Sequence, residues 1–231
     1  MKRFYTAVTV TDESDGFSVA LDGKPLRTPQ KHRLMLPNIR LAEAVAAEWQ
    51  AQAETIQPHQ MPLTRLASTA IDRVAALREP VIEETVGYAG SDLVCYRADT
   101  SAELAAREAA GWQPLIDWLM LRYDAPLIVT AGILPVTQPA ATLDALRGVL
   151  RRLDDFRLTA VAVLTATCGS LALALALLDG RITAHETYAL AMIDESFQVE
   201  RWGEDAEAAH RRRNIAAEID DTGRFLALLA S

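Results

Sequence analysis

The segment from Leu158 to Leu178 contains no charged residue and is long enough to cross a lipid bilayer, so it limits what the chain can fold into. It must either enter a membrane or be buried in a protein core. Much of it is alanine, threonines and the Gly169-Ser170 pair interrupt it, and no aromatic belt flanks it. These features favour a pair of buried helices with a break near Thr167–Ser170, and no stable membrane insertion. We therefore expect a largely helical core.

Composition narrows the class of protein further. The chain has 231 residues, a net charge of −8 and a pI near 5.1, which argues against nucleic acid as a partner because phosphates require a basic surface. Arg151–Arg152 and Arg211–Arg213 are clustered cations, and we interpret both as solvated helix faces. Cys95 and Cys168 lie in apolar surroundings, which indicates reduced core cysteines. The N-terminus shows no signal peptide pattern, so we expect a cytoplasmic protein.

The first part of the sequence has the pattern of β-strands. Residues 4–10 are rich in aromatic, threonine and valine residues, and residues 17–21 alternate in polarity. Asp22-Gly23 is a strong hairpin signal that would return the chain along Lys24–Thr28. A further short strand is expected at Arg33–Leu36. Such a small sheet is not stable alone and must pack on other elements.

From Asn38 onward the periodicity is helical. Asn38 is a suitable N-cap for a helix running to about Ala53, and Pro80 would begin another. Two capping boxes, Thr100 with Glu103 and Thr183 with Glu186, mark further helix starts. The predicted fold class is therefore α+β, with a small antiparallel β unit followed by a larger all-helical domain. We place a β-rich domain at residues 1–60, with its boundary between 37 and 60, and a helical domain at residues 61–231.

Most catalytic templates have no counterpart in the sequence. No glycine-rich loop has the spacing and lysine of a phosphate-binding loop, and the four histidines are scattered without metal-ligand spacing. We expect no metal and no cofactor. Asp72 and Asp92, each next to apolar residues, fit helix capping or buried hydrogen bonding better than catalysis.

The stretch Phe197–Asp205 breaks the rules of the helix that contains it. Gly203 is unfavourable inside a helix, Glu200 and Glu204 would repel each other on one face, and Trp202 lies between acidic residues. One interpretation is a helix junction that also serves for docking, in which Gly203 ends one helix and Glu204-Asp205 open the next. The alternative is an acid–base hydrolase that uses Glu200 and Glu204, because glycosidases place paired acids near aromatics.

Several ordered motifs, taken together, resemble a known family: the assembly chaperones of the F-type ATP synthase that bind its free alpha subunit. The similarity runs nearly end to end, and it differs mildly at Glu108 and Gln113, where the family pattern has a glutamine and an aspartate. The motifs in order are Arg3–Tyr5, Leu21–Pro29, Glu48–Gln52, Met61–Thr64, Asp92–Leu93, Cys95–Arg97, Trp112, Pro114–Leu115, Trp118, Phe197–Gln198 and Trp202–Asp205.

This resemblance implies a non-enzymatic chaperone, of the bacterial cytoplasmic type, whose partner is the ATP synthase alpha subunit. We expect it to be a monomer when free. The family's acidic functional position corresponds to Glu204, and Trp202, Asp205 and Glu200 are the neighbouring partner-binding candidates. An acid beside an exposed aromatic can bind an arginine or backbone amides of a partner.

Overall fold

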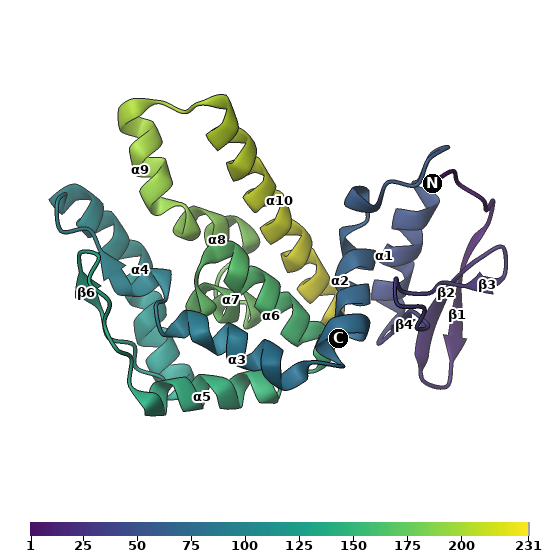
Figure 1. The fold of residues 1–231 in the computed structure, drawn as a ribbon, viewed down its shortest axis with the longest axis horizontal. Helices are drawn as coiled ribbons and strands as arrows, with labels where there is room; N and C mark the ends of the chain where they lie inside the picture. Colours follow the sequence, from purple (N-terminus) through teal and green to yellow (C-terminus); the bar gives the residue numbers. More distant parts are fainter. Residues whose placement is uncertain (231) are drawn as a thin grey trace. The chain divides into compact units, whose positions relative to one another are not determined.

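The computed structural model describes residues 1–230, and Figure 1 shows its helices and strands. The chain divides into two compact units. The first contains Met1–Arg78, Asp155–Ala160 and the chain from Arg224 onward, and the second contains Glu79–Asp154 and Val161–Gly223. The fold is α+β, with a small antiparallel sheet followed by many helices, as predicted. The division into domains at residues 1–60 and 61–231 stays a prediction.

The sheet of the first unit is built around β2 (Gly16–Leu21). β1 (Val8–Glu13) pairs with it along its whole length, and β3 (Lys24–Pro25) and β4 (Met35–Leu36) add short antiparallel pairings. The hairpin at Asp22-Gly23 is confirmed, because both residues have positive φ, 47° and 77°. The other strand bounds differ from the prediction: the first strand starts at Val8 and runs on to Glu13, and the last is limited to Met35–Leu36. The return strand is limited to Lys24–Pro25, although the Leu26 N–H still donates to the Val19 carbonyl at 2.8 Å.

Helix α1 (Ile39–Gln50) packs on the sheet, and Figure 1 shows it beside β1 and β2. The predicted cap is confirmed, since the Asn38 side chain accepts a hydrogen bond from the Leu41 N–H at 2.9 Å. After the short 3₁₀ turn Pro58–Gln60, α2 (Pro62–Thr69) begins. The buried carboxylate of Glu48 accepts hydrogen bonds from the backbone N–H of Leu63 and Thr64 at 2.7 and 2.8 Å. Two of the sequence motifs thus meet in one cap, where α1 fixes the start of α2.

The second unit is helical apart from the short parallel pair β5 (Tyr96–Arg97) and β6 (Thr130–Ala131). Its helix α4 (Ala102–Tyr123) packs against other helices, and Trp112 and Leu119 are among its buried residues. The predicted Thr100 cap is wrong: Ser101 caps α4 at Leu104, one residue later, because a serine is an equally good N-cap. α4 also continues through Pro114 without restarting. The remaining helices and the 3₁₀ turn are α3 (Arg78–Ala89), η3 (Leu93–Cys95), α5 (Ala140–Arg151), α8 (Ala184–Ala191), α9 (Ile193–Trp202) and α10 (Ala206–Leu229).

The uncharged segment forms most of α6 (Asp155–Cys168) and all of α7 (Leu171–Leu178), with the predicted break between them. Ser170 caps α7 by accepting a hydrogen bond from the Leu173 N–H at 3.1 Å. The first six residues of α7 are all buried, as expected for a helix that is apolar on every side. Within residues 1–230, no helix combines the length and the hydropathy needed to cross a membrane.

Candidate functional site

The acidic stretch forms the junction between α9 and α10, which Figure 1 shows as a short loop. α9 ends at Trp202, and Gly203 then takes φ 82°, a conformation that favours glycine. A Cβ atom at Gly203 would meet no other atom within 4 Å, so backbone conformation, and not space, requires glycine here. The predicted helix junction is confirmed.

Asp205 is the residue that caps α10. Its Oδ1 accepts hydrogen bonds from the N–H groups of Glu207 at 2.9 Å and Ala208 at 2.8 Å. These groups have no partner within the helix, so the carboxylate satisfies them and also places a negative charge at the positive end of the helix dipole. A structural role is therefore present at Asp205.

Glu204 contacts an arginine of the following helix and does not cap it. Its Oε1 lies 3.0 Å from Nη1 of Arg212. The Arg212 guanidinium also contacts the hydroxyl oxygens of Tyr188 and Ser196 at 3.3 and 3.2 Å, so three segments are joined. The Glu204 side chain stays about a third exposed, at 32%. Part of this carboxylate is therefore accessible to another molecule.

Glu200 belongs to a separate network between α9 and α4. Its carboxylate lies 2.7 Å from Arg107, which also pairs with Glu103, and Glu103 in turn pairs with Arg201. Both arginines lie over the ring of Phe197. This network holds the face of α9 that carries Glu200 against α4. Glu204 takes no part in it, because Glu204 pairs with Arg212 of α10.

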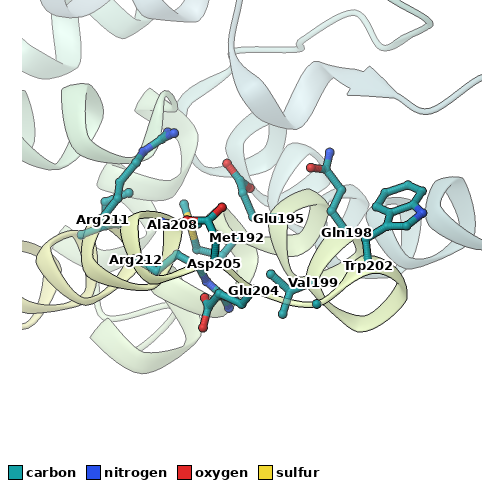
Figure 2. Close-up of a pocket in the computed structure, with 12 residues that line it drawn as sticks. Met192, Glu195, Gln198, Val199, Trp202, Glu204, Asp205, Ala208, Arg211 and Arg212 are labelled. Carbon is teal, nitrogen blue, oxygen red and sulfur yellow. Dashed lines mark hydrogen bonds and ion pairs between the residues drawn. The ribbon is translucent and has the colours of Figure 1, made fainter.

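A cavity of about 220 Å³ lies beside the junction. Figure 2 shows Trp202 at one end of it and Arg211 at the other. Trp202 is 76% exposed, which is unusual for the largest apolar side chain. The lining residues are Met192, Glu195, Gln198, Val199, Trp202, Gly203, Glu204, Asp205, Ala208, Arg211, Arg212 and Ile215. The surface thus combines carboxylates with an exposed aromatic and arginines, and the last two are enriched at protein interfaces.

The arrangement does not assemble an acid–base pair. Glu200 and Glu204 are held by arginines on different helices, and Glu200 does not line the cavity. A hydrolase of the kind considered above needs two carboxyl groups facing one substrate. Across residues 1–230 no group of three or more histidine, cysteine or acidic side chains could hold a metal ion.

The other candidate residues have structural roles, as the sequence indicated. Asp92 is fully buried and accepts hydrogen bonds from the N–H groups of Val94 and Ala172 at 3.2 and 3.1 Å. Burial raises its pKa to about 6, against the opposing effect of these hydrogen bonds. Asp72 accepts hydrogen bonds from Thr28 and His32. Cys95 and Cys168 are buried free cysteines, and burial raises the pKa of each thiol to about 12.

One pair of carboxyl groups was not anticipated from the sequence. Asp194 at the start of α9 interacts with the buried Glu108 of α4, and its buried Oδ1 has no hydrogen-bond partner among the described residues. Burial is the main cause, and Glu108 the second, of an Asp194 pKa raised to about 6. No periodicity could have revealed this pair, because it joins residues of two helices far apart in sequence.

The interpretation of Arg211–Arg213 as a solvated face was wrong for Arg212. Only 22% of its side chain is exposed, because Glu204, Ser196 and Tyr188 surround it. Acids close to Arg212 in sequence suggested a solvated face and concealed this role. The acid that pairs with it is Glu204, in the junction that precedes α10. Met192, Glu195 and Gln198 were also missed as lining residues, because they read as ordinary helix positions.

Comparisons with known proteins agree with this architecture. A family model described as the ATP12 chaperone protein matches residues 2–120. Two crystal structures of Atp12 from Paracoccus denitrificans, one of them a point mutant, are each 45% identical to this chain with a TM-score of 0.94. Each alignment covers 98% of this chain and 97% of the other.

More distant relatives also align over most of the sequence. The structure of the Atu1473 protein from Agrobacterium tumefaciens is 40% identical, with a TM-score of 0.91, over 99% of this chain and 85% of the other. The mitochondrial protein atp12 of Schizosaccharomyces pombe is 25% identical over 225 residues, which cover 92% of this chain and 77% of the relative. The family model spans more than half of the sequence and the Paracoccus structures nearly all of it, so the chain belongs to the ATP12 chaperone family.

Proposed function

We propose that this chain is an assembly chaperone of the F-type ATP synthase that binds the free alpha subunit. Membership in the ATP12 chaperone family supports the chaperone role. The specific client comes from the resemblance of the sequence motifs, which extends from Arg3–Tyr5 to Trp202–Asp205. Before assembly, the alpha subunit exposes the surface that later contacts the beta subunit, and the chaperone shields it.

The single observation that best supports a docking site is the exposed Trp202 beside a cavity with charged walls. Binding energy at protein interfaces concentrates on a few aromatic and arginine side chains near desolvated pockets. Glu204, partly exposed and held in place by Arg212, can accept hydrogen bonds from an arginine of the client. Asp205 lines the same cavity and adds negative charge there, whereas Glu200, which pairs with Arg107 outside the cavity, stays a candidate from the sequence alone.

Co-expression tests the proposed client directly. The alpha subunit is produced alone or together with this chain, and its soluble fraction and co-purification are measured. We expect the alpha subunit to become soluble and to co-purify at a stoichiometric ratio. An alpha subunit that aggregates equally with and without this chain, while the chain itself is folded, contradicts the proposal.

The residues of the docking site are tested with Glu204→Lys. The substitution reverses the charge that faces the client, and we expect about a tenfold or greater loss of affinity for the alpha subunit. Glu207→Lys is the matched control, because Glu207 is an exposed acid in the first turn of α10 that does not line the cavity. If a folded Glu204→Lys variant captures the alpha subunit as strongly as wild type, Glu204 does not belong to the docking site. The same conclusion follows if Glu207→Lys loses as much affinity as Glu204→Lys.

A further inference from the structure

A second and larger cavity, of about 710 Å³, lies in the first unit. Three segments build it: the loop after β3, the end of α1 with the chain that follows, and α2 with the turn after it. Its position coincides with three of the sequence motifs, Leu21–Pro29, Glu48–Gln52 and Met61–Thr64. The residues lining it include Arg27, Trp49, Ile56, Met61, Arg65 and Arg73.

The cavity is held open by buried polar contacts. Glu48 fixes the first turn of α2 through Leu63 and Thr64, as described above. Thr28 donates a hydrogen bond to Asp72 at 2.6 Å, which ties the loop after β3 to the turn after α2. A preformed cavity binds with less loss of conformational entropy than one that must be ordered.

The turn after α2 departs from regular helix. Residues Ala70–Val74 form a π-helical turn, in which the Ala75 N–H donates to the Ala70 carbonyl at 3.0 Å. Such turns are rare and are found frequently at functional sites. This one carries Asp72 and Arg73, and both line the cavity.

Trp49, one of the lining residues, carries a hydrogen-bond donor without an acceptor in the described part of the chain. Among the described residues, the buried Nε1 of Trp49 has no hydrogen-bond partner. A buried donor left unpaired is destabilising, and tryptophan usually finds an acceptor when buried. Met1, Pro29 and Pro58 also line the cavity and are exposed, so they supply accessible apolar surface. An occupant with a carbonyl oxygen and a bulky apolar group would satisfy both features.

The charge of the lining is opposite to that of the chain. Arg27, Arg65 and Arg73 all line the cavity and are exposed, and Asp72 is the one acid in the lining. The lining residues therefore carry net positive charge in a chain of net charge −8. This complementarity favours an occupant with carboxylate groups.

We propose that this cavity is a peptide-binding site for an extended segment that places a bulky apolar side chain beside a carboxylate. The Trp49 N–H donates to a backbone carbonyl of the peptide, the apolar side chain contacts Met1 and Pro58, and the arginines contact the carboxylate. The inference rests on the proposed function only for the source of the peptide, which would be an exposed segment of the client. It adds a contact site separate from the α9–α10 junction.

A fluorescence-anisotropy titration of the full chain tests this proposal without any alpha subunit. The probe is a fluorescein-labelled peptide of sequence Ser-Leu-Phe-Glu-Leu-Glu-Ser, compared with the same peptide carrying lysine in place of both glutamates. The variant Arg27→Glu reverses one positive charge in the lining, and Arg40→Glu is its matched control. Both arginines are exposed and donate one hydrogen bond to a backbone carbonyl at 2.8 Å, but Arg40 does not line the cavity.

We expect the acidic peptide to bind at least about tenfold more tightly than the lysine peptide, with about a tenfold loss in Arg27→Glu and less than about twofold in Arg40→Glu. Trp49→Phe should weaken binding about threefold to tenfold by deleting the N–H, whereas Trp202→Phe should leave it unchanged. Circular dichroism confirms that each variant is folded.

The proposal is overturned if both peptides bind equally, if neither binds, or if the Arg40→Glu control weakens binding as much as Arg27→Glu. Binding of laurate, an acidic amphiphile, with the same dependence on Arg27 and without peptide binding would also overturn it. Because the probe is a free peptide, failure of alpha-subunit capture leaves this result unaffected, and the reverse also holds.

Discussion

Asp205 and Glu204 have different structural roles, and this difference gives the most specific prediction for stability. Both acids lie at the start of α10, but only Asp205 accepts hydrogen bonds from the free N–H groups of the first turn, those of Glu207 and Ala208. Asp205→Ala should therefore destabilise the protein, whereas Glu204→Gln should not do so to a comparable extent.

The expected magnitudes follow from these contacts. Loss of an N-cap costs about 0.5–2 kcal/mol, and loss of a carboxylate at the positive end of the helix dipole about 0.3–1 kcal/mol, so Asp205→Ala should cost about 1–3 kcal/mol. In a chain of this size, 1 kcal/mol lowers Tm by about 2–4 °C, which gives a decrease of about 2–12 °C. Glu204→Gln keeps an acceptor for Arg212 and loses a partly exposed ion pair, worth about 0.5–1 kcal/mol at most.

The assay is thermal unfolding followed by far-ultraviolet circular dichroism near neutral pH. Asp205→Asn serves as a control, because asparagine keeps the capping oxygen and loses only the charge, so its Tm should lie between those of wild type and Asp205→Ala. The reasoning is refuted if Glu204→Gln lowers Tm as much as Asp205→Ala does.

Three further predictions concern buried groups. The raised pKa of Asp194 means that its contribution to stability is present below about pH 3.8 and is lost as pH rises through about 6, so Asp194→Asn should flatten the dependence of the unfolding free energy on pH in that window. Asp92→Ala should cost about 3 kcal/mol or more in urea unfolding, because it leaves two buried N–H groups unpaired. Cys95 and Cys168 should resist a thiol reagent in the folded protein and react once it is unfolded, and rapid labelling under native conditions would contradict their burial.

Elements set by local chemistry could be predicted from the sequence. The Asn38 cap, the Asp22-Gly23 hairpin and the Thr183 capping box depend on residues within a few positions of one another, and all three are present. The break at Ser170 also follows from local composition. The start of α4 was misplaced because Thr100 and Ser101 are both good caps, and only the packing of the helix decides between them.

The candidate site was predictable in part. Gly203 and Asp205 indicate a helix junction, because a glycine that ends one helix and an acid that caps the next are close together in sequence. The arginines that pair with Glu200 and Glu204 are not adjacent to them in sequence. Arg107, the partner of Glu200, lies on α4, and Arg212, the partner of Glu204, lies on α10. The sequence therefore left an acid–base pair open as an alternative, which the pairing of each acid with its own arginine removes.

The central claim is that the α9–α10 junction binds the free alpha subunit, and the most direct measurement is the dissociation constant of that complex for Trp202→Ala. Ile133→Ala is the control, since Ile133 is 95% exposed in the same compact unit and does not line the cavity. The account predicts at least about a tenfold weaker complex for Trp202→Ala, with an unchanged Tm, and wild-type affinity for Ile133→Ala. Wild-type affinity in a folded Trp202→Ala variant would contradict it.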